Sequence, residues 1–244
     1  MSIRPRLVAN NDAAPEVPLE ERMYLEIYDA IMEHRLPAGT KLAEQTLAEI
    51  YGVARHPVRK VLSRLAADGL VDLEPNRGAF IASPSEQEAH DMFDLRQTLE
   101  GRVVQQAAQA GEAADFKRLR AMIARERDAY MQGNRPQWIR LSAEFHIELA
   151  KLSGNTLVVD LLRRLVSRST LLLSTPEASG HQPCSFDEHL AVVEALEQKD
   201  EALAQERMMR HLDQCACRMS DGTSRRFDLR AALGRAGNKP VGNS

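Results

Sequence analysis

Four cations gather in one ten-residue stretch of the chain that contains no carboxylate. They are Arg55, Arg59, Lys60 and Arg64, within "RHPVRKVLSR", although the 244 residues carry a formal net charge of -3. A local positive patch attracts phosphate groups, and the planar guanidinium of Arg can bond two acceptors of guanine at once. The pattern indicates contact with nucleic acid. The alternative interpretation is a solvated helix face, because charged residues commonly face water.

The same stretch has the spacing of an amphipathic helix. Its apolar residues recur at one helical face and are Val58, Val61, Leu62 and Leu65. Pro57 is tolerated only in a first helical turn, so we expect the helix to begin close to Arg55. This arrangement puts Arg55 and Arg59 near the helix start, where recognition helices usually contact bases.

The flanking sequence predicts a small domain around this helix. Residues 1–18 lack periodicity and are expected to form a flexible arm, whereas spacing-four apolar residues from 19 to 34 predict a first helix. A second helix fits Glu44 to Tyr51, and Gly52 suits its end. After the cationic helix, "LVDL" and "GAFIAS" read as two strands joined by "EPNR". Three helices and a hairpin over residues 19–84 predict a winged helix-turn-helix domain.

The spaced residues of this domain are similar to a known family. The segment "LPAGTKL…LAEIYGVARHPVRKVLSRLAADGLVDLEPNRGAFI" resembles the winged helix-turn-helix of the GntR family of bacterial transcription regulators, over residues 20–83. The resemblance implies that Arg55 and Arg59 enter the major groove and that Gln45 and Arg64 support phosphate contacts. It also implies that the wing approaches the minor groove. The implied DNA-contacting residues are Gln45, Arg55, His56, Arg59, Arg64, Asn76, Arg77 and Gly78.

Two positions depart from the family pattern at the start of the recognition helix. The family usually has Ser and Thr where this chain has Ala54 and His56. Ala54 has no side-chain oxygen, so it can neither cap the helix nor donate a hydrogen bond to a phosphate.

The second half of the chain predicts an all-α bundle. Helical periodicity fits six segments, with "SEQE" and "SFDE" as candidate capping boxes and Asp200 as a further N-cap. Expected buried stripes include Met92, Leu95, Leu99 and Val103 on the first helix and Leu157, Leu161 and Leu165 on the fourth. The segments are 85 onward, 113–131, 135–153, 155–174, 185–198 and 200–219. The fold class is therefore mainly α, with an effector-binding and dimerisation domain over residues 85–220 and a loose basic tail over 221–244.

This half resembles the FCD effector domain of the FadR subfamily, over roughly residues 88–220. The matching pieces are "DLRQTLEGRVVQQAA", "EFHIELAKLSGNTLV", "EHLAVVEAL" and "KDEALAQERMMRHL". Many such domains hold a divalent metal on one aspartate and three histidines. The histidines match His146, His189 and His211, whereas the aspartate position is Ser142. The resemblance thus implies a Zn or Ni site whose carboxylate ligand is replaced by a hydroxyl.

The local pattern supports an inward direction for these imidazoles. His189 shares a helical face with Val193 and Leu196, and His211 lies on the stripe of Met208 and Cys215. Three inward imidazoles can bind Zn or a similar metal, with water or an effector carboxylate completing the shell. For any single one of them, the alternative is a hydrogen-bonded core histidine.

Arg96 and Ser142 are the expected effector-binding residues. Arg96 matches an Arg that the family pattern uses near the pocket, and a guanidinium suits a carboxylate. The alternative for Arg96 is an ion pair with Glu100 one helical turn later. The resemblance therefore implies a small organic acid as effector.

Composition and motif spacing limit the other functions. No apolar run is long enough for a membrane span and no signal peptide is evident, so we expect a soluble cytoplasmic protein. The cysteines Cys184, Cys215 and Cys217 lack metal-finger spacing and are expected to be thiols. A metal-dependent hydrolase lacks a general base, because Glu144 and Glu188 are expected to point elsewhere. A helical interaction module without DNA binding is the third alternative.

The sequence thus predicts a homodimeric, ligand-responsive transcription factor. Two recognition helices would read a double-stranded, roughly palindromic operator, because half-site symmetry follows protein symmetry. Effector binding in the bundle would change operator affinity by the difference in its affinity for the two states.

Overall fold

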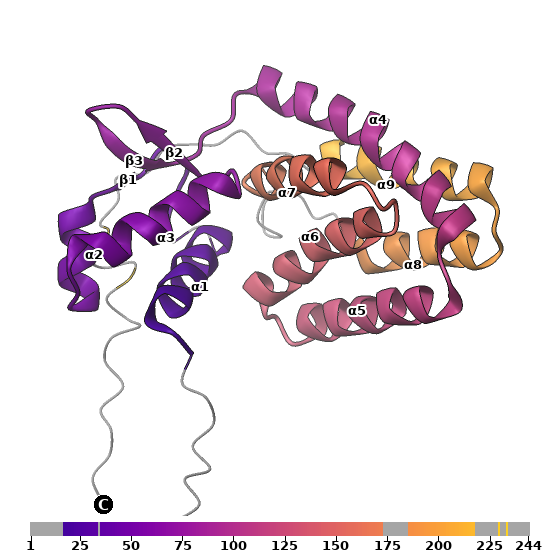
Figure 1. Cartoon of the computed structure of the whole chain (residues 1–244), viewed down its shortest axis with the longest axis horizontal. Helices are drawn as coiled ribbons and strands as arrows, with labels where there is room; N and C mark the ends of the chain where they lie inside the picture. Colours follow the sequence, from indigo (N-terminus) through magenta and orange to yellow (C-terminus); the bar gives the residue numbers. More distant parts are fainter. Residues whose placement is uncertain (1–16, 34, 173–184, 218–228, 230–232, 234–244) are drawn as a thin grey trace, which may run out of the picture.

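The computed structural model describes residues 17–33, 35–172 and 185–217, together with Leu229 and Leu233. The described chain is mainly helical, as predicted, with one small sheet (Figure 1). The elements are α1 (Leu19–Met32), β1 (Lys41–Leu42), α2 (Glu44–Tyr51), α3 (Arg55–Ala67), β2 (Val71–Glu74), β3 (Gly78–Ile81), α4 (Glu86–Ala110), α5 (Ala113–Met131), α6 (Arg135–Lys151), α7 (Thr156–Thr170), α8 (Ser185–Glu197) and α9 (Glu201–Cys217).

The first three helices form the helix-turn-helix that the sequence predicted. The α2 helix ends where Gly52 adopts the left-handed conformation, with φ of 64°. The α3 helix begins at Arg55, so Pro57 lies in its first turn, and Ala54 supplies no side-chain cap. The expected apolar stripe of α3 is buried and packs with α1 and α2 into one core. The opposite face of α3 is therefore exposed and can contact another molecule.

The wing is a three-stranded sheet in the order β1-β3-β2, with all pairs antiparallel. The hairpin of β2 and β3 was predicted, but β1 was not. Two residues are too few to show an alternating pattern, and β1 is defined by its pairing of Leu42 with Ala79. Asn76 has a φ of 61° at the hairpin tip, a conformation that Asn tolerates better than most residues.

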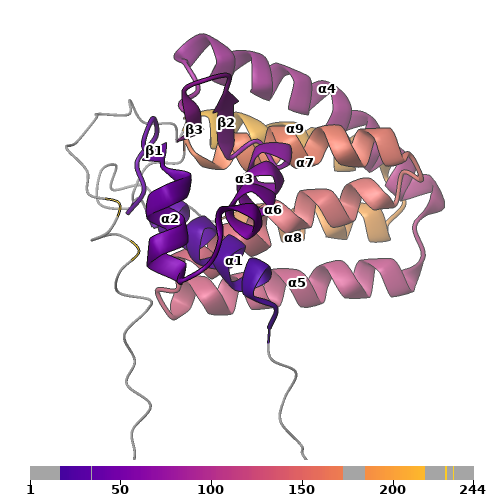
Figure 2. The same cartoon turned by 60° about the vertical axis from the view of Figure 1, so that its left-hand side comes forward.

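The remaining helices form the predicted bundle, in which α4 packs against α9 and α5 against α6 and α8 (Figures 1 and 2). Two predicted caps are present: Ser85 Oγ accepts a hydrogen bond from the Glu88 amide at 3.1 Å, and Asp200 Oδ1 accepts one from the Leu203 amide at 2.9 Å. The Ser185 side chain, expected to cap α8, lies outside the described residues, as do most of residues 1–18 and 221–244.

The predicted core stripe of α7 was wrong. Leu157 and Leu161 are 72% and 53% exposed, whereas Leu162 and Val166 are buried. The two stripes differ by one residue, which is a rotation of about 100° around a helix. The helices packed against α7, chiefly α6 and α4, select the second stripe. On α4, Leu95 is also exposed (50%), contrary to its predicted place in the core.

The end of α7 contacts the N-terminal winged domain. Arg168 donates hydrogen bonds to Asp72 Oδ1 on β2 at 2.8 Å and to Glu88 Oε1 on α4 at 2.5 Å. Gly69, with φ of +77°, lies against the α7 backbone, and a Cβ at this position would be 3.0 Å from the carbonyl oxygen of Arg164. Glycine at residue 69 thus allows both the turn into β2 and the close approach of α7.

Replacing Arg168 with Ala is expected to loosen the two domains. Two ion pairs of partly exposed side chains are lost, and together they contribute about 1 kcal/mol. The linker between β3 and α4 should then be cut by a protease about five-fold faster under native conditions. Arg118→Ala is the control, because Arg118 is a 68% exposed arginine on α5, away from the contact between the domains. Equal cleavage rates for the two variants would contradict this role of Arg168.

Candidate functional site

Three buried histidines from three helices converge in the bundle. His146 on α6, His189 on α8 and His211 on α9 each have a nitrogen within 4.8 Å of the others. The Nε2 atom of His211 lies 3.2 Å from Nε2 of His189 and 3.2 Å from Nε2 of His146. The structure therefore brings together the three histidines that the family resemblance singled out.

Each histidine is oriented by a carboxylate on its other ring nitrogen. The Nδ1 atoms of His146, His189 and His211 lie 2.5, 2.9 and 2.6 Å from a glutamate oxygen. The glutamates are, in the same order, Glu100 on α4, Glu126 on α5 and Glu188 on α8. Carboxylates in this position fix the tautomer and the ring direction of metal-binding histidines.

The carboxylates determine what the centre of the cluster requires. Because ionised carboxylates only accept hydrogen bonds, we assign the protons of the neutral imidazoles to Nδ1. In that state three Nε2 lone pairs face one another at the centre, an arrangement that a bound cation would stabilise. Tetrahedral Zn–N bonds of about 2.0–2.1 Å would separate two donors by about 3.3 Å, close to the observed 3.2 Å.

The protonation of the three imidazoles differs. Burial lowers the pKa of His146 to about 3, although the Glu100 carboxylate opposes the change, and burial likewise lowers the pKa of His189. Burial also acts to lower the pKa of His211, but the Cys215 sulfur and the Glu188 carboxylate outweigh it and raise the pKa to about 10.

A small cavity adjoins His146. Its volume is about 40 Å³, and Arg96, Ser142, Ser169 and Cys215 are among its lining residues. Arg96 Nε donates to Glu100 Oε1 at 2.7 Å, and Nη1 donates to Ser169 Oγ at 2.9 Å. The Nη2 atom is buried without a hydrogen-bond partner among the described residues. Arg96 therefore forms the ion pair with Glu100 that one interpretation predicted, and it also lines a cavity; its contact with an effector stays a prediction.

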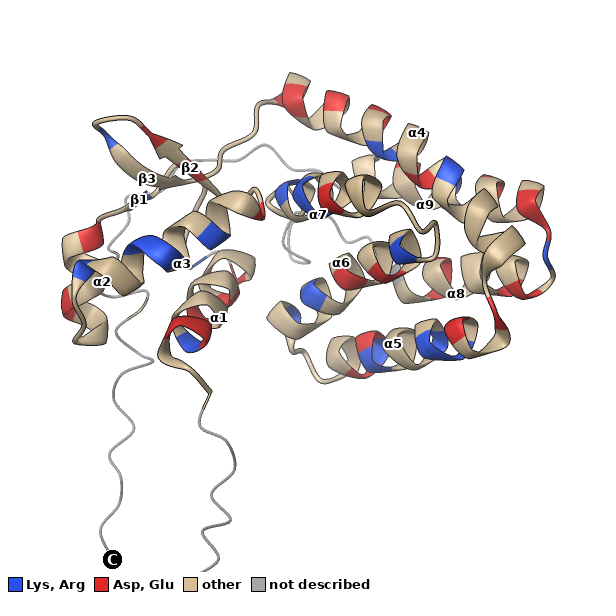
Figure 3. Ribbon diagram, viewed as in Figure 1, with Lys and Arg blue, Asp and Glu red and all other residues tan. Residues whose placement is uncertain are grey.

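The outer face of α2, α3 and the wing carries exposed cations whose charges are partly compensated within the chain. Blue segments mark the cations of α3 in Figure 3. Arg55 donates to Gln45 Oε1 on α2 at 2.6 and 2.9 Å, and Arg59 pairs with Glu44 at 2.8 Å. Arg77 in the wing pairs with Glu74. All the residues expected to contact DNA are exposed: Gln45, Arg55, His56, Arg59, Arg64, Asn76, Arg77 and Gly78.

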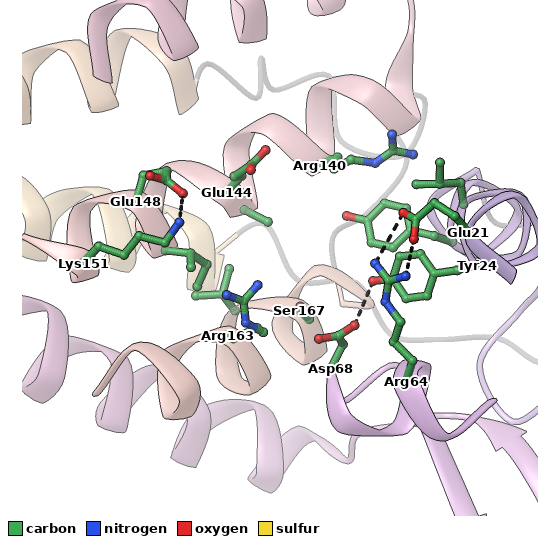
Figure 4. Close-up of a pocket in the computed structure, with 15 residues that line it drawn as sticks. Glu21, Tyr24, Arg64, Asp68, Arg140, Glu144, Glu148, Lys151, Arg163 and Ser167 are labelled. Atoms are coloured by element: carbon green, nitrogen blue, oxygen red, sulfur yellow. Dashed lines mark hydrogen bonds and ion pairs between the residues drawn. The ribbon is translucent and has the colours of Figure 1, made fainter. Parts of the chain in front are cut away.

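Arg64 faces a different part of the molecule. It pairs with Glu21 on α1 and its guanidinium lies 3.8 Å from the centre of the Tyr24 ring, while Tyr24 donates to Asp68 at 2.9 Å (Figure 4). These residues line a cleft of about 500 Å³ between α1 and α3 on one side and α6 and α7 on the other. In this conformation a phosphate contact by Arg64 would require its release from Glu21.

Two family descriptions cover most of the chain. Residues 19–81 match the gntR family of bacterial regulatory proteins, and residues 91–214 match the FCD domain. The chain belongs to the GntR family. It is a transcription regulator with an N-terminal DNA-binding domain and a C-terminal FCD effector domain.

Known relatives of this GntR regulator are themselves regulators. The HTH-type transcriptional repressor RspR of Escherichia coli K12 is 25% identical over 82% of this chain and 88% of its own. The HTH-type transcriptional repressor NanR of Cronobacter sakazakii is 26% identical over 80% and 83%. The structure of E. coli McbR/YncC has the same fold, with a TM-score of 0.67 at 18% identity over 91% of this chain and 100% of that chain. The two repressors are transcription regulators, as this chain is, and the solved structure shows the shared fold.

Within residues 17–33, 35–172 and 185–217, no helix is both long and apolar enough to span a bilayer.

The orienting glutamates were the part of the site that sequence reasoning missed. Glu100 was considered only as a partner of Arg96, and Glu126 was not considered. Glu188 was expected to point elsewhere; it does not bind the adjacent His189, but it reaches His211 on α9. Sequence spacing describes directions within one helix, so it could not reveal a contact between α8 and α9. Glu144, by contrast, lines the interdomain cleft.

Replacing Glu188 with Gln is expected to weaken divalent metal binding by the GntR regulator about ten-fold. Loss of a carboxylate that orients a ligand typically reduces affinity 10- to 100-fold, and we expect the lower end because Glu188 is 19% exposed. Zinc titration against a competing chelator measures the change. The matched control is Glu194→Gln on the same helix, which pairs with Arg207 and should retain wild-type affinity. An unchanged affinity in Glu188→Gln would contradict the orienting role.

Proposed function

We propose that this GntR regulator is a homodimeric member of the FadR subfamily whose affinity for a roughly palindromic operator is set by a small organic acid. In this proposal the acid binds in the FCD domain beside a divalent metal held by three histidines. The observation that carries the proposal is Nη2 of Arg96, which is buried, has no hydrogen-bond partner among the described residues, and belongs to a side chain lining a cavity that adjoins the histidine cluster.

The DNA contacts would follow from the exposed face of α3 and the wing. Arg55 and Arg59 would read base edges, because they lie in the first two turns of the recognition helix. Their present partners, Gln45 and Glu44, lie on α2. Binding to phosphates or bases would replace these solvent-exposed contacts, which contribute little to the stability of the fold. Contacts to the DNA backbone would come from the other exposed residues, which are His56, Arg64, Asn76, Arg77 and Gly78.

The metal would neutralise a charged shell. With neutral imidazoles, the carboxylates of Glu100, Glu126 and Glu188 and the guanidinium of Arg96 leave a net formal charge of -2 around the cluster. Burying such a charge is costly, and a divalent cation would balance it. Zn or Ni suits three imidazole donors, and the bound ion would offer an open position to an anionic oxygen.

The effector would be a carboxylate. A cavity of about 40 Å³ holds a group of about three heavy atoms, since one water needs about 10–15 Å³ of the same kind of volume. The carboxylate would accept a hydrogen bond from Arg96 Nη2 and another from the Ser142 hydroxyl. A carboxylate in the cavity would also affect the hydrogen bond that Arg96 donates to Ser169, at the end of α7.

The homodimer would use the leucines that α7 and α4 expose. Leu157 and Leu161 lie one turn apart on α7, and Leu95 lies on α4, which packs beside α7. Exposed apolar side chains on adjacent helices favour burial against a second copy, and a two-fold contact would pair the same surface of each chain.

Leu161→Glu is therefore expected to shift the protein from dimer to monomer. A carboxylate placed opposite its own copy adds repulsion and desolvation at the interface. Sedimentation equilibrium should show a dimer dissociation constant raised at least 100-fold. The control Met131→Glu substitutes another exposed apolar side chain, 64% exposed at the end of α5, and should remain dimeric. A dimer of unchanged affinity in Leu161→Glu would exclude this surface.

The whole function is tested by selecting DNA and then titrating acids. Full-length protein is used to enrich duplexes from a random library, and the recovered site is bound at several concentrations of small mono- and dicarboxylates. An enriched palindrome whose affinity changes with one acid supports the proposal, and Arg96→Lys should reduce that response. No enrichment would favour an interaction module without DNA binding. Enrichment with no response to any acid would overturn the effector class.

A further inference from the structure

The small cavity beside His146 and the interdomain cleft share a boundary. The cavity has a volume of about 40 Å³ and the cleft one of about 500 Å³. Ala143 on α6 and Val166 on α7 line both spaces, so these two side chains separate them. We propose that the effector is an elongated acid with two carboxylates, one in the cavity and the other in the cleft at Arg163. This inference rests on the proposed effector site and names the class of acid that the site takes.

The α6 and α7 helices form the two walls that lead from the cavity to the cleft. Only residues 152–155 connect them, so the helices run antiparallel. A row along one face of α7 leads from the cleft to the cavity and consists of Arg163, Val166 and Thr170. The row on α6 leads from the cavity to the cleft and consists of Ile139, Ala143 and Ile147. Both rows therefore cross the boundary at the residue that lines the two spaces.

The dimensions of the two spaces require an elongated molecule. The cavity holds about three heavy atoms, so it takes one carboxylate and excludes the rest of a longer acid. Residues 163 and 170 are about 10 Å apart along the helix axis. The side chains between them are apolar, because Ala143 and Val166 form the boundary. A chain of methylene groups would gain from burial against these side chains and would connect the two charged ends.

Arg163 supplies the charge for the second carboxylate. It is exposed, lines the cleft and forms no hydrogen bond or ion pair with another described residue (Figure 4). The other cations that line the cleft each have a carboxylate partner, and they are Arg64, Arg140 and Lys151. A guanidinium without a partner can bind a carboxylate through two parallel hydrogen bonds. Arg163 is therefore the cation of the cleft that is ready to bind an anion.

A carboxylate in the cleft also has a competitor, an ammonium group held by Glu144. This glutamate is exposed, lines the cleft and has no partner among the described residues. It follows Ala143 directly, so its side chain is turned by about 100° from the row that leads to the cavity. Arg163 lies on the row of Val166, one turn away. Arg163, and not Glu144, is therefore aligned with the boundary, and the second end of the effector is anionic.

An acid that reaches Arg163 would contact both domains. Tyr24 on α1 and Arg64 on α3 line the opposite side of the cleft (Figure 4). The second end of the acid would therefore lie beside the winged domain, although the first end is enclosed in the bundle. An acid with one carboxylate would occupy the cavity alone. The two kinds of acid would thus differ in how strongly they favour one relative placement of the domains.

The test measures the binding of acids to the full-length protein by calorimetry in a buffer that contains Zn²⁺. The probes are straight-chain dicarboxylates from succinate to suberate, each compared with the monocarboxylate of the same number of carbons. At least one dicarboxylate should bind about ten-fold more tightly than its monocarboxylate. Arg163→Gln should remove this advantage and leave the binding of the monocarboxylate unchanged. Arg164→Gln is the matched control, because Arg164 is exposed and lines neither space.

A second variant tests the boundary between the two spaces. In Ala143→Leu, the larger side chain fills the room between α6 and α7 that the methylene chain needs. The advantage of the dicarboxylate should fall at least five-fold in this variant, and circular dichroism should show an unchanged helix content. A full advantage in Ala143→Leu would overturn the passage of the acid between the helices.

The outcomes separate this inference from the proposed function. Equal binding of dicarboxylates and monocarboxylates, or an advantage that persists in Arg163→Gln, would overturn the acid with two carboxylates and leave an effector with one. Tighter binding of amino acids with a terminal ammonium group, at the same chain length, would assign the cleft to Glu144 and overturn the role of Arg163. No binding of any acid would overturn the effector class itself, and this inference with it.

Discussion

His189→Ala is expected to remove divalent metal from the protein and to destabilise the metal-free fold by about 3–5 kcal/mol. The imidazole is one of three converging donors, so metal content should fall from about one ion per chain to none after dialysis. The stability loss follows from Glu126, which is 1% exposed and would lose its imidazole partner. Elemental analysis measures the first effect, and urea unfolding in the presence of a chelator measures the second.

A double variant separates these two effects. In His189→Ala, Glu126→Gln, the buried carboxylate is replaced by a neutral amide, so much of the lost stability should return while metal binding stays absent. A His189→Ala protein that keeps one tightly bound ion would contradict the three-histidine site. Equal stability of the single and double variants would instead mean that the charge of Glu126 is balanced by other groups.

Arg59→Ala is expected to weaken operator binding by about 1–3 kcal/mol, which is about 5- to 150-fold, and to relax base preference at one position in each half-site. The side chain is 61% exposed on the face of α3 opposite the buried stripe, so its loss should leave the fold intact. Fluorescence anisotropy with the selected duplex and with single-base variants measures both affinity and preference.

Arg118→Ala is the matched control for the DNA experiment. Arg118 is 68% exposed and pairs with Asp115 on α5, away from the recognition helix, and its loss should not change affinity. Uniform weakening on all sequences by Arg59→Ala, with a smaller salt slope, would assign Arg59 to a phosphate. Unchanged affinity would remove Arg59 from the interface altogether.

The fold was predictable because local patterns and global packing agree over most of the chain. The α3 stripe, the Gly52 terminus and the Asp200 cap are local features, and the structure contains each of them. The α7 helix shows the limit of such reasoning. Two apolar stripes one residue apart are both present in its sequence, and only the neighbouring helices decide that Leu162, rather than Leu161, is buried.

The candidate site was predictable in its histidines but not in their surroundings. Family spacing identified His146, His189 and His211, and helical periodicity agreed that the last two face inward. The glutamates that orient them come from α4, α5 and α8, and each acts on a histidine of another helix. Cys215 was interpreted as a thiol, and among the described residues it forms no disulfide; its sulfur lies against the ring of His211, one turn earlier on the same helix.

The last turn of α7 joins two sites through neighbouring residues. Arg168 contacts Asp72 of the wing, and the next residue, Ser169, accepts a hydrogen bond from Arg96 at the cavity. Because residues 168 and 169 are adjacent, a shift of this turn would change the contact with Asp72 and the contact with Arg96 together. Under the proposed function, substitutions at residues 166–170 would therefore change how operator binding responds to an effector without removing a contact to either the DNA or the effector.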